Sequence, residues 1–146
     1  MTRPTISSET VHASAVAIEG RAVLIGGLSG TGKSDLALRL IDRGAALISD
    51  DYCDVRRVEG HARASAPANI LGMIEMRGVG IVEMATEQHV PIGLFVDLDG
   101  APDRMPEPGE TRSLAGVAVP VLRLSGLEAS APIKVEAALR LIGLPA

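Results

Sequence analysis

The stretch Ala22-Val23-Leu24-Ile25-Gly26-Gly27-Leu28-Ser29-Gly30-Thr31-Gly32-Lys33-Ser34 decides how the rest of the chain is interpreted. Its apolar start indicates a buried strand, and residues 27–34 fit the phosphate-loop pattern G-x-x-x-x-G-K-[S/T]. Apolar residues at helical spacing follow over 33–43, and Gly44 is a typical helix stop. A tight turn with a solvated lysine is the alternative, but it leaves the Gly-Lys-Ser order unexplained.

The composition of this loop matches the chemistry of phosphate binding. Glycines let successive backbone N–H groups point inward at the positive end of the following helix, which makes a concave anion site. We expect Lys33 to contact the β- and γ-phosphates and the Ser34 hydroxyl to face Mg²⁺. ATP and Mg²⁺ are therefore the expected cofactors. The predicted nucleotide-binding residues are Gly27, Leu28, Ser29, Gly30, Thr31, Gly32, Lys33 and Ser34.

Composition restricts the class of protein. A chain of 146 residues with 47% hydrophobic residues predicts one domain spanning 1–146. With 14 basic and 18 acidic side chains and no basic run, nucleic acid is not an expected partner. Aromatic residues make up only 1% of the chain, which removes platforms for base stacking. A small molecule or a protein fits better as the substrate.

The sequence also bears on location. Cys53 is the only cysteine, so no disulfide within the chain is expected, and a packing role is favoured over a catalytic thiol. The N-terminus lacks an apolar signal core, and no window approaches the roughly 20 apolar residues of a membrane span. We therefore expect a cytoplasmic protein that does not contact the membrane.

The order of apolar segments predicts an α/β fold with a mixed sheet and packed helices. Residues 10–18 and 21–26 are expected to form an antiparallel hairpin that brings His12 near the loop. The other expected elements are a strand at 45–49, a hairpin of 52–58 and 61–65, strands at 90–98 and 114–124, and a helix at 133–141. Residues 1–9 and 99–113 are predicted to be exposed and irregular.

Several acidic and basic residues are candidates for the chemistry. Asp50-Asp51 ends a strand about 17 residues beyond Lys33, where one carboxylate can hold Mg²⁺ and the other can take a proton. A solvated acidic turn is the alternative for this pair. His12 is either a proton donor or phosphate contact, or a structural histidine. Glu75 and Arg77 could serve metal and phosphoryl oxygen beside Gly78 and Gly80, although a salt-bridged surface strand fits the pattern better.

Four separate pieces of the chain resemble one family. They are Val-His at 11–12, Gly-x-Ser-Gly-x-Gly-Lys-Ser at 27–34, Leu-Ile-Ser-Asp-Asp at 47–51 and Glu-x-Arg-Gly-x-Gly-Ile at 75–81. Their order resembles the catalytic domain of the HPr kinase/phosphorylase family, in a short form without the N-terminal domain. The resemblance covers most of residues 10–98, and its specificity rests on the last motif.

The resemblance implies an enzyme that phosphorylates a serine of the phosphocarrier protein HPr with ATP and can reverse this step by phosphorolysis. By motif, Asp51 would be the general base, Asp50 would assist it, and His12 would lie beside the transferred phosphoryl group. Lys33 would complete the catalytic set. The implied metal ligands are Ser34, Glu75 and Asp51, and the implied residues facing HPr are Arg77, Gly78 and Gly80. The family is often hexameric, which leaves a homo-oligomer open.

The chain departs from the family pattern late in the sequence. Residues 120–126 read Pro-Val-Leu-Arg-Leu-Ser-Gly, with one arginine where the family has an arginine-rich loop. This difference motivates a second hypothesis, a nucleotide-binding regulator without turnover. A third hypothesis is a small-molecule kinase, because the sequence holds no signature of a substrate pocket.

Overall fold

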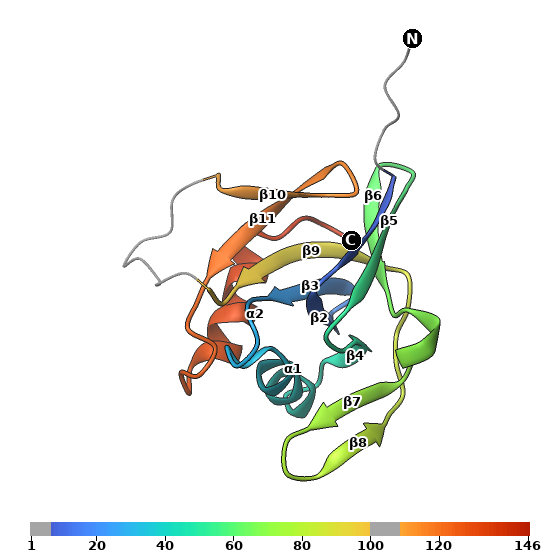
Figure 1. The fold of residues 1–146 in the computed structure, drawn as a ribbon. Helices are drawn as coiled ribbons and strands as arrows, with labels where there is room; N and C mark the ends of the chain where they lie inside the picture. The colour runs from blue at the N-terminus through green and yellow to red at the C-terminus, as the bar shows by residue number, and fades with distance from the viewer. Residues whose placement is uncertain (1–6, 100–108) are drawn as a thin grey trace.

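The computed structural model describes residues 7–99 and 109–146, which form the predicted α/β fold with a mixed sheet (Figure 1). Its elements in chain order are β1 (Ser8–Val11), β2 (Ala13–Ile18), β3 (Arg21–Gly26), α1 (Lys33–Asp42), β4 (Ala46–Ser49), β5 (Cys53–Val58), β6 (His61–Ser65), η1 (Ala68–Ile70), β7 (Met73–Met76), β8 (Gly80–Glu83), β9 (Val90–Asp97), β10 (Thr111–Leu114), β11 (Val117–Arg123) and α2 (Ala131–Ile142).

The pairing of the strands brings several strand ends to one edge of the sheet. The order is β1-β5-β6-β9-β3-β2-β4, with β11 alongside the last residues of β9 and β10 beside β11. Strands β3 and β11 both pair in parallel with β9, whereas β2 is antiparallel to both β3 and β4. The carboxyl ends of β3, β4, β9 and β11 and the start of β2 therefore lie at the same edge. This is the edge where ligands bind in open α/β sheets.

Apolar side chains cover both faces of the sheet because strand residues alternate between faces. On β9, Leu94 and Val96 pack with α1 and α2, whereas Phe95 points to the opposite face. That second face is covered by residues of β1, β5, β6, β10 and β11, since their buried side chains join the cluster around Phe95. The helices thus lie on one face and the outer strands close over the other.

Three hairpins turn through a two-residue X-Gly step with positive φ at both positions. The pairs are Glu19-Gly20, Glu59-Gly60 and Ala115-Gly116, with φ between 48° and 81°. This is the signature of the type I′ turn, which matches the twist of the flanking strands. The first two turns confirm the predicted hairpins. The third shows that the single strand predicted over 114–124 was wrong, because the chain reverses at Ala115-Gly116 and forms β10 and β11.

Three other sequence predictions also need correction. Ser8 and Glu9, within the stretch predicted to fray, belong to β1 (Ser8–Val11), which pairs with β5. Within 99–113, residues 100–108 lie outside the described residues, but Thr111–Leu114 is a strand. The last helix starts two residues earlier than predicted, at Ala131. Pro132 is accepted in the first turn because a backbone N–H there would have no partner within the helix, so the N–H that proline lacks is not missed.

Phe95 tests the packing of the second face. It is the only phenylalanine, is 2% exposed, and carries the Arg112 guanidinium 4.3 Å from its ring centre. Phe95→Ala should lower the free energy of unfolding by about 3–5 kcal/mol, because it leaves a cavity in a buried core. Urea denaturation measures this loss. Leu141→Ala, at a site 83% exposed, should change the same quantity by less than about 0.5 kcal/mol.

Candidate functional site

The segment 27–34 joins the end of β3 to the start of α1, as the phosphate-loop pattern predicts. Gly27 and Gly32 have φ of 153° and 95°, and Gly32 is the N-cap of α1. A Cβ on Gly27 would lie 2.7 Å from Thr31 Oγ1, so a larger residue would push the loop apart. The sequence needs glycine at both positions because positive φ strains other residues.

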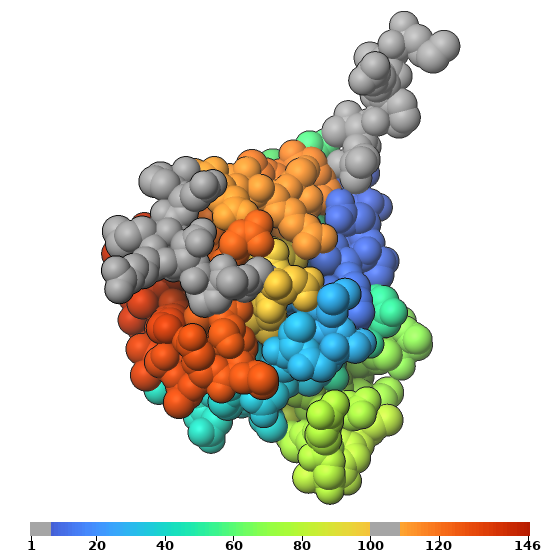
Figure 2. Space-filling view, turned by 60° about the vertical axis from the view of Figure 1, so that its left-hand side comes forward, coloured from blue at the N-terminus to red at the C-terminus, as the bar shows by residue number. Residues whose placement is uncertain are grey.

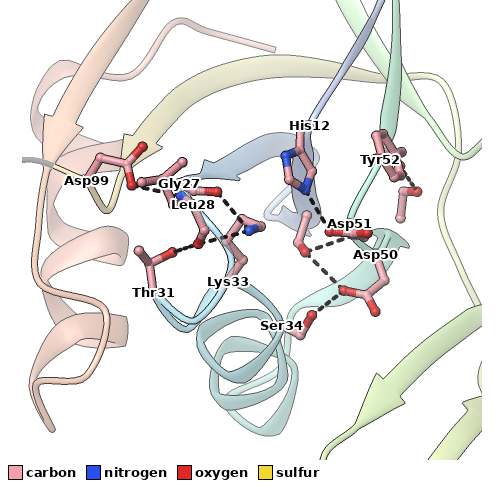
Figure 3. A network of polar contacts seen from close by, with 12 residues as sticks. His12, Gly27, Leu28, Thr31, Lys33, Ser34, Asp50, Asp51, Tyr52 and Asp99 are labelled. Carbon is pink, nitrogen blue, oxygen red and sulfur yellow. Dashed lines mark hydrogen bonds and ion pairs between the residues drawn. The ribbon is translucent and has the colours of Figure 1, made fainter.

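Lys33 is buried and contacts the loop itself (Figure 3). Its Nζ donates to Gly27 O at 2.8 Å and to Leu28 O at 3.3 Å. Thr31 Oγ1 donates to the same Leu28 carbonyl at 2.6 Å. The ammonium group therefore lies inside the curl of the loop, at the position from which a phosphate-loop lysine reaches phosphate.

Asp50, just after β4, links three elements through one carboxylate. Its Oδ1 accepts hydrogen bonds from Ser34 Oγ at 2.6 Å and from Ser14 Oγ at 3.0 Å, and its Oδ2 accepts one from Glu75 N at 3.0 Å. Asp50 is 8% exposed and Ser14 is fully buried. The acid in contact with the phosphate-loop serine is therefore Asp50, whereas the sequence prediction had given the metal-ligand role to Asp51.

Asp51 is held in a strained turn that aims its side chain away from Asp50. Its φ is 67°, and Tyr52 N donates to Asp50 O at 2.8 Å, which closes a three-residue turn of the rare γ type. Ser14 Oγ accepts from Asp51 N at 3.1 Å, and Ser49 Oγ donates to Tyr52 O. Strain of this kind persists only where neighbouring groups enforce it, and it is concentrated at functional sites.

His12 faces the second carboxylate. Its Nε2 lies 2.9 Å from Asp51 Oδ1, and its ring stacks on Tyr52 with centroids 5.0 Å apart (Figure 3). The expected continuous strand over 10–18 is broken at His12, which separates β1 from β2 and is thereby free to turn toward Asp51. The His12 and Asp51 side chains are 46% and 57% exposed, so the pair is open to an incoming group.

The phosphate loop and both carboxylates, Asp50 and Asp51, line one cleft of about 650 Å³. Its wall combines the loop and α1 with the β7–β8 hairpin, and the space-filling view shows this hairpin in yellow-green beside the light-blue loop (Figure 2). The lining residues are Ser29, Gly30, Gly32, Lys33, Ser34, Asp35, Leu38, Asp50, Asp51, Glu75, Met76, Arg77, Val79 and Leu127. Glu75 and Arg77 thus belong to the site, while Gly78 and Gly80 lie at the exposed bend of the hairpin with positive φ.

A protein-only metal cluster is not part of this arrangement. Among residues 7–99 and 109–146, no group of three or more histidine, cysteine, aspartate or glutamate side chains could hold a metal ion. A hydroxyl and a carboxylate in contact at the start of α1 do fit Mg²⁺, which is bound by one or two protein oxygens with phosphate and water completing the shell. The donor set therefore suits a metal that arrives with a nucleotide.

Cys53 lies next to the site but has a packing role. It is fully buried in the second-face core, and burial raises the pKa of its thiol to about 12. Its Sγ contacts the carbonyls of Asp54 and Ser65. A thiol that stays protonated and enclosed cannot act as a nucleophile at neutral pH, in agreement with the prediction from sequence.

Sequence reasoning missed three residues that shape the site. Ser14 and Ser49 hold the acidic turn, and Tyr52 stacks on His12. Ser14 interrupts an otherwise apolar strand, which was a usable signal, because a buried hydroxyl needs partners. The late arginine, Arg123, forms ion pairs with Asp97 at 3.1 Å and Glu110 at 2.6 Å, and it is not among the residues that line the cleft.

A glycine-rich loop leads into α1, and Asp50 at the end of β4 contacts the loop serine Ser34. These features define an α/β domain of the P-loop class. Comparison with known families is more specific. The chain belongs to the family described as HPr Serine kinase C-terminal domain, whose model matches residues 5–140. The family resemblance seen in the four sequence motifs is confirmed.

Individual relatives agree with this assignment. An HPr kinase/phosphorylase of Clostridium botulinum (strain Eklund 17B / Type B) is 45% identical over 74 residues, which is 51% of this chain and 24% of that protein. One from Clostridium perfringens (strain SM101 / Type A) is 32% identical over 126 residues, which is 78% of this chain and 41% of that protein. The chain thus matches about a quarter to two fifths of the length of these relatives.

A solved structure shares the fold. The structure of the Hpr(Ser) kinase/phosphatase from Coxiella burnetii superimposes with a TM-score of 0.77 at 28% identity, over 91% of this chain and 95% of that chain. In addition, none of the helices in the described residues is long and apolar enough to span a membrane.

Ser14 tests how the acidic turn is held. Ser14→Ala removes a donor to Asp50 and leaves the Asp51 N–H without its acceptor, so the free energy of unfolding should fall by about 1–3 kcal/mol. Urea denaturation followed by circular dichroism measures the change. Ser113→Ala, at an exposed position of β10, is the control and should have almost no effect. Equal stabilities for the two variants would show that the turn does not depend on Ser14.

Proposed function

We propose that this chain is a Mg²⁺-dependent protein-serine kinase that transfers the γ-phosphoryl group of ATP to a serine of HPr or an HPr-like phosphocarrier protein. The observation that carries the proposal is that Asp50, in contact with the phosphate-loop Ser34, and Asp51, paired with His12, line the same cleft. The relatives are named HPr kinase/phosphorylase, which supports HPr as the substrate.

The nucleotide would be held by the loop and the first turn of α1. The backbone N–H groups of 28–34 and the Lys33 ammonium bind the phosphates. Ser34 and Asp50 would hold Mg²⁺, which neutralises charge on the transferred group when bound. This differs from the sequence prediction of Asp51 as the metal ligand, because Asp50 is the acid in contact with Ser34. Glu75 stays a predicted second ligand; its backbone N–H contacts Asp50, and its side chain is exposed on the cleft wall.

Asp51 is the proposed general base. Its carboxylate is directed by the strained turn and by His12, so that it can accept the proton of a seryl hydroxyl as the oxygen attacks phosphorus. More than half of its surface is exposed. Such exposure suits a serine presented on another protein, and it argues against the small-molecule kinase, which benefits from an enclosed site.

The β7–β8 hairpin is the proposed docking element for the protein substrate. Arg77, Gly78 and Gly80 lie at its exposed bend, and Val79 there is 75% exposed. Arg77 and Val79 also line the cleft, so a protein bound to the hairpin would present its serine to Asp51. Phosphorolysis of phosphoserine-HPr remains an additional proposal, tested by adding phosphate to the phosphorylated substrate.

The same proposal places the protein in the cytoplasm as one catalytic domain over residues 1–146. A free, buried cysteine is compatible with a reducing compartment. Assembly as a homo-oligomer is part of the proposal and is measured by light scattering of the purified chain.

Transfer of labelled phosphate tests the proposed activity. The purified chain is incubated with γ-labelled ATP, Mg²⁺ and HPr from the same organism, and the label on HPr serine is measured. Label on HPr supports the kinase. Stable nucleotide binding without any transfer would instead support the regulator, and label on a metabolite but not on protein would support the small-molecule kinase.

Asp51→Asn and Asp50→Asn should separate the two carboxylates. Asp51→Asn should lower kcat by about 10²- to 10⁴-fold with little change in nucleotide affinity, because it removes only the proton acceptor. Asp50→Asn should instead weaken binding of Mg·ADP, because it removes a ligand of the metal. Kinetics and calorimetric titration measure these changes, with circular dichroism to confirm folding. Full kinase activity in folded Asp51→Asn would contradict the base assignment.

A further inference from the structure

A carboxylate occupies one backbone donor of the phosphate loop. Leu28 N, the second residue of the loop, donates a hydrogen bond of 2.7 Å to Asp99 Oδ1 (Figure 3). Asp99 is exposed and lies just beyond the end of β9, two residues after Asp97. Loop amides of this kind are the groups that bind phosphate oxygens. An acidic side chain of the protein therefore engages a donor that belongs to the anion site.

The position of Asp99 is fixed by the end of the sheet. Leu98 N donates to Gly26 O at 2.9 Å, which continues the register of β9 and β3 beyond the strands. Asp99 N donates to Asp97 Oδ1 at 2.8 Å, and the other oxygen of Asp97 pairs with Arg123 at 3.1 Å. These contacts run alongside residues 26–28. The pairing of the strands thus places the backbone of Asp99 beside the loop, within reach of Leu28 N.

Two side chains of the loop also have partners inside it. The Lys33 ammonium is held by the carbonyls of Gly27 and Leu28, and the Leu28 carbonyl also accepts from Thr31 Oγ1. A nucleotide would have to attract Lys33 toward its phosphates in competition with these carbonyls. Asp99 adds a negative charge beside the same residues, and that charge opposes an incoming polyphosphate.

We propose that Asp99 lowers the affinity of the phosphate loop for polyphosphate ligands, because its carboxylate engages the Leu28 N–H and repels the phosphates. This inference rests on the proposed nucleotide-binding function and adds a residue that sets its strength. Binding of a nucleotide is then coupled to release of Asp99 from Leu28, at the edge of the sheet where β9 ends.

The competing interpretation is that Asp99 braces the loop in its binding shape. The two roles make opposite predictions. Asn at position 99 keeps an oxygen that can accept from Leu28 N but removes the charge, whereas Ala removes both. If Asp99 repels phosphate, both substitutions strengthen binding. If Asp99 is a brace, Asp99→Asn leaves the affinity unchanged and Asp99→Ala weakens it.

The test measures the Kd of Mg·ADP and of inorganic pyrophosphate by calorimetry for the full chain and its variants. Asp99→Asn should bind both ligands tighter by on the order of fivefold at low salt, and the gain should shrink when salt shortens the Debye length. Asp99→Ala should gain at least as much. Asp42→Asn, which removes an equal charge at the opposite end of α1, should leave both Kd values unchanged.

The outcomes separate this inference from the proposed function. Tight Mg·ADP binding by the unmodified chain that is lost in Lys33→Ala, with no gain in Asp99→Asn, would overturn the role of Asp99 and leave the nucleotide site intact. Binding that appears only in the Asp99 variants would support the role of Asp99. If neither the unmodified chain nor any Asp99 variant binds, the nucleotide site and the role of Asp99 are both wrong. An amide shift of Leu28 in Asp99→Ala, but not in Asp42→Asn, would report loss of the contact independently of any ligand.

Discussion

The carboxylate of Asp50 holds together the elements from which the cleft is built. Ser14 comes from β2 in the sheet, Ser34 from the first turn of α1, and Glu75 N from β7 in a hairpin outside the main sheet. A buried carboxylate needs donors to offset the loss of water, and here each donor belongs to a different part of the fold. The position of the hairpin relative to the phosphate loop therefore depends on a group that is also suited to metal binding.

This arrangement ties the two halves of the site to each other. Ser14 donates to Asp50 and accepts from the N–H of Asp51, so one buried hydroxyl fixes both the acid beside the loop and the turn that aims its neighbour. The two carboxylates then face different partners, Ser34 for the first and His12 for the second. The two adjacent, chemically identical residues face different partners because the second, Asp51, has a positive φ.

The sequence was informative where local rules act and failed where tertiary partners decide. The phosphate loop, α1 and the two Glu-Gly hairpins follow from glycine positions and periodicity, and the structure agrees with them. The Ala115-Gly116 turn was missed because it lies inside an apolar run. The start of β1 at Ser8 and Glu9 was missed because these polar residues gain their structure only by pairing with β5. The proximity of His12 and of Asp50-Asp51 to the loop was predicted from the order of the strands, whereas the place of Glu75 at the site was implied only by the family resemblance. Which acid meets Ser34 was not predicted, because it depends on a turn angle that adjacent aspartates do not reveal.

One feature of the cleft also gives the molecule a built-in optical reporter. The chain has no tryptophan and a single tyrosine, and that tyrosine is Tyr52, stacked on His12 beside Asp51. The near-ultraviolet fluorescence of the protein therefore originates almost entirely from Tyr52, which is 48% exposed. This fluorescence responds to whatever alters the stacking on His12. Arrival of a ligand beside Tyr52 can be followed in the unmodified protein, without a dye and without a substitution.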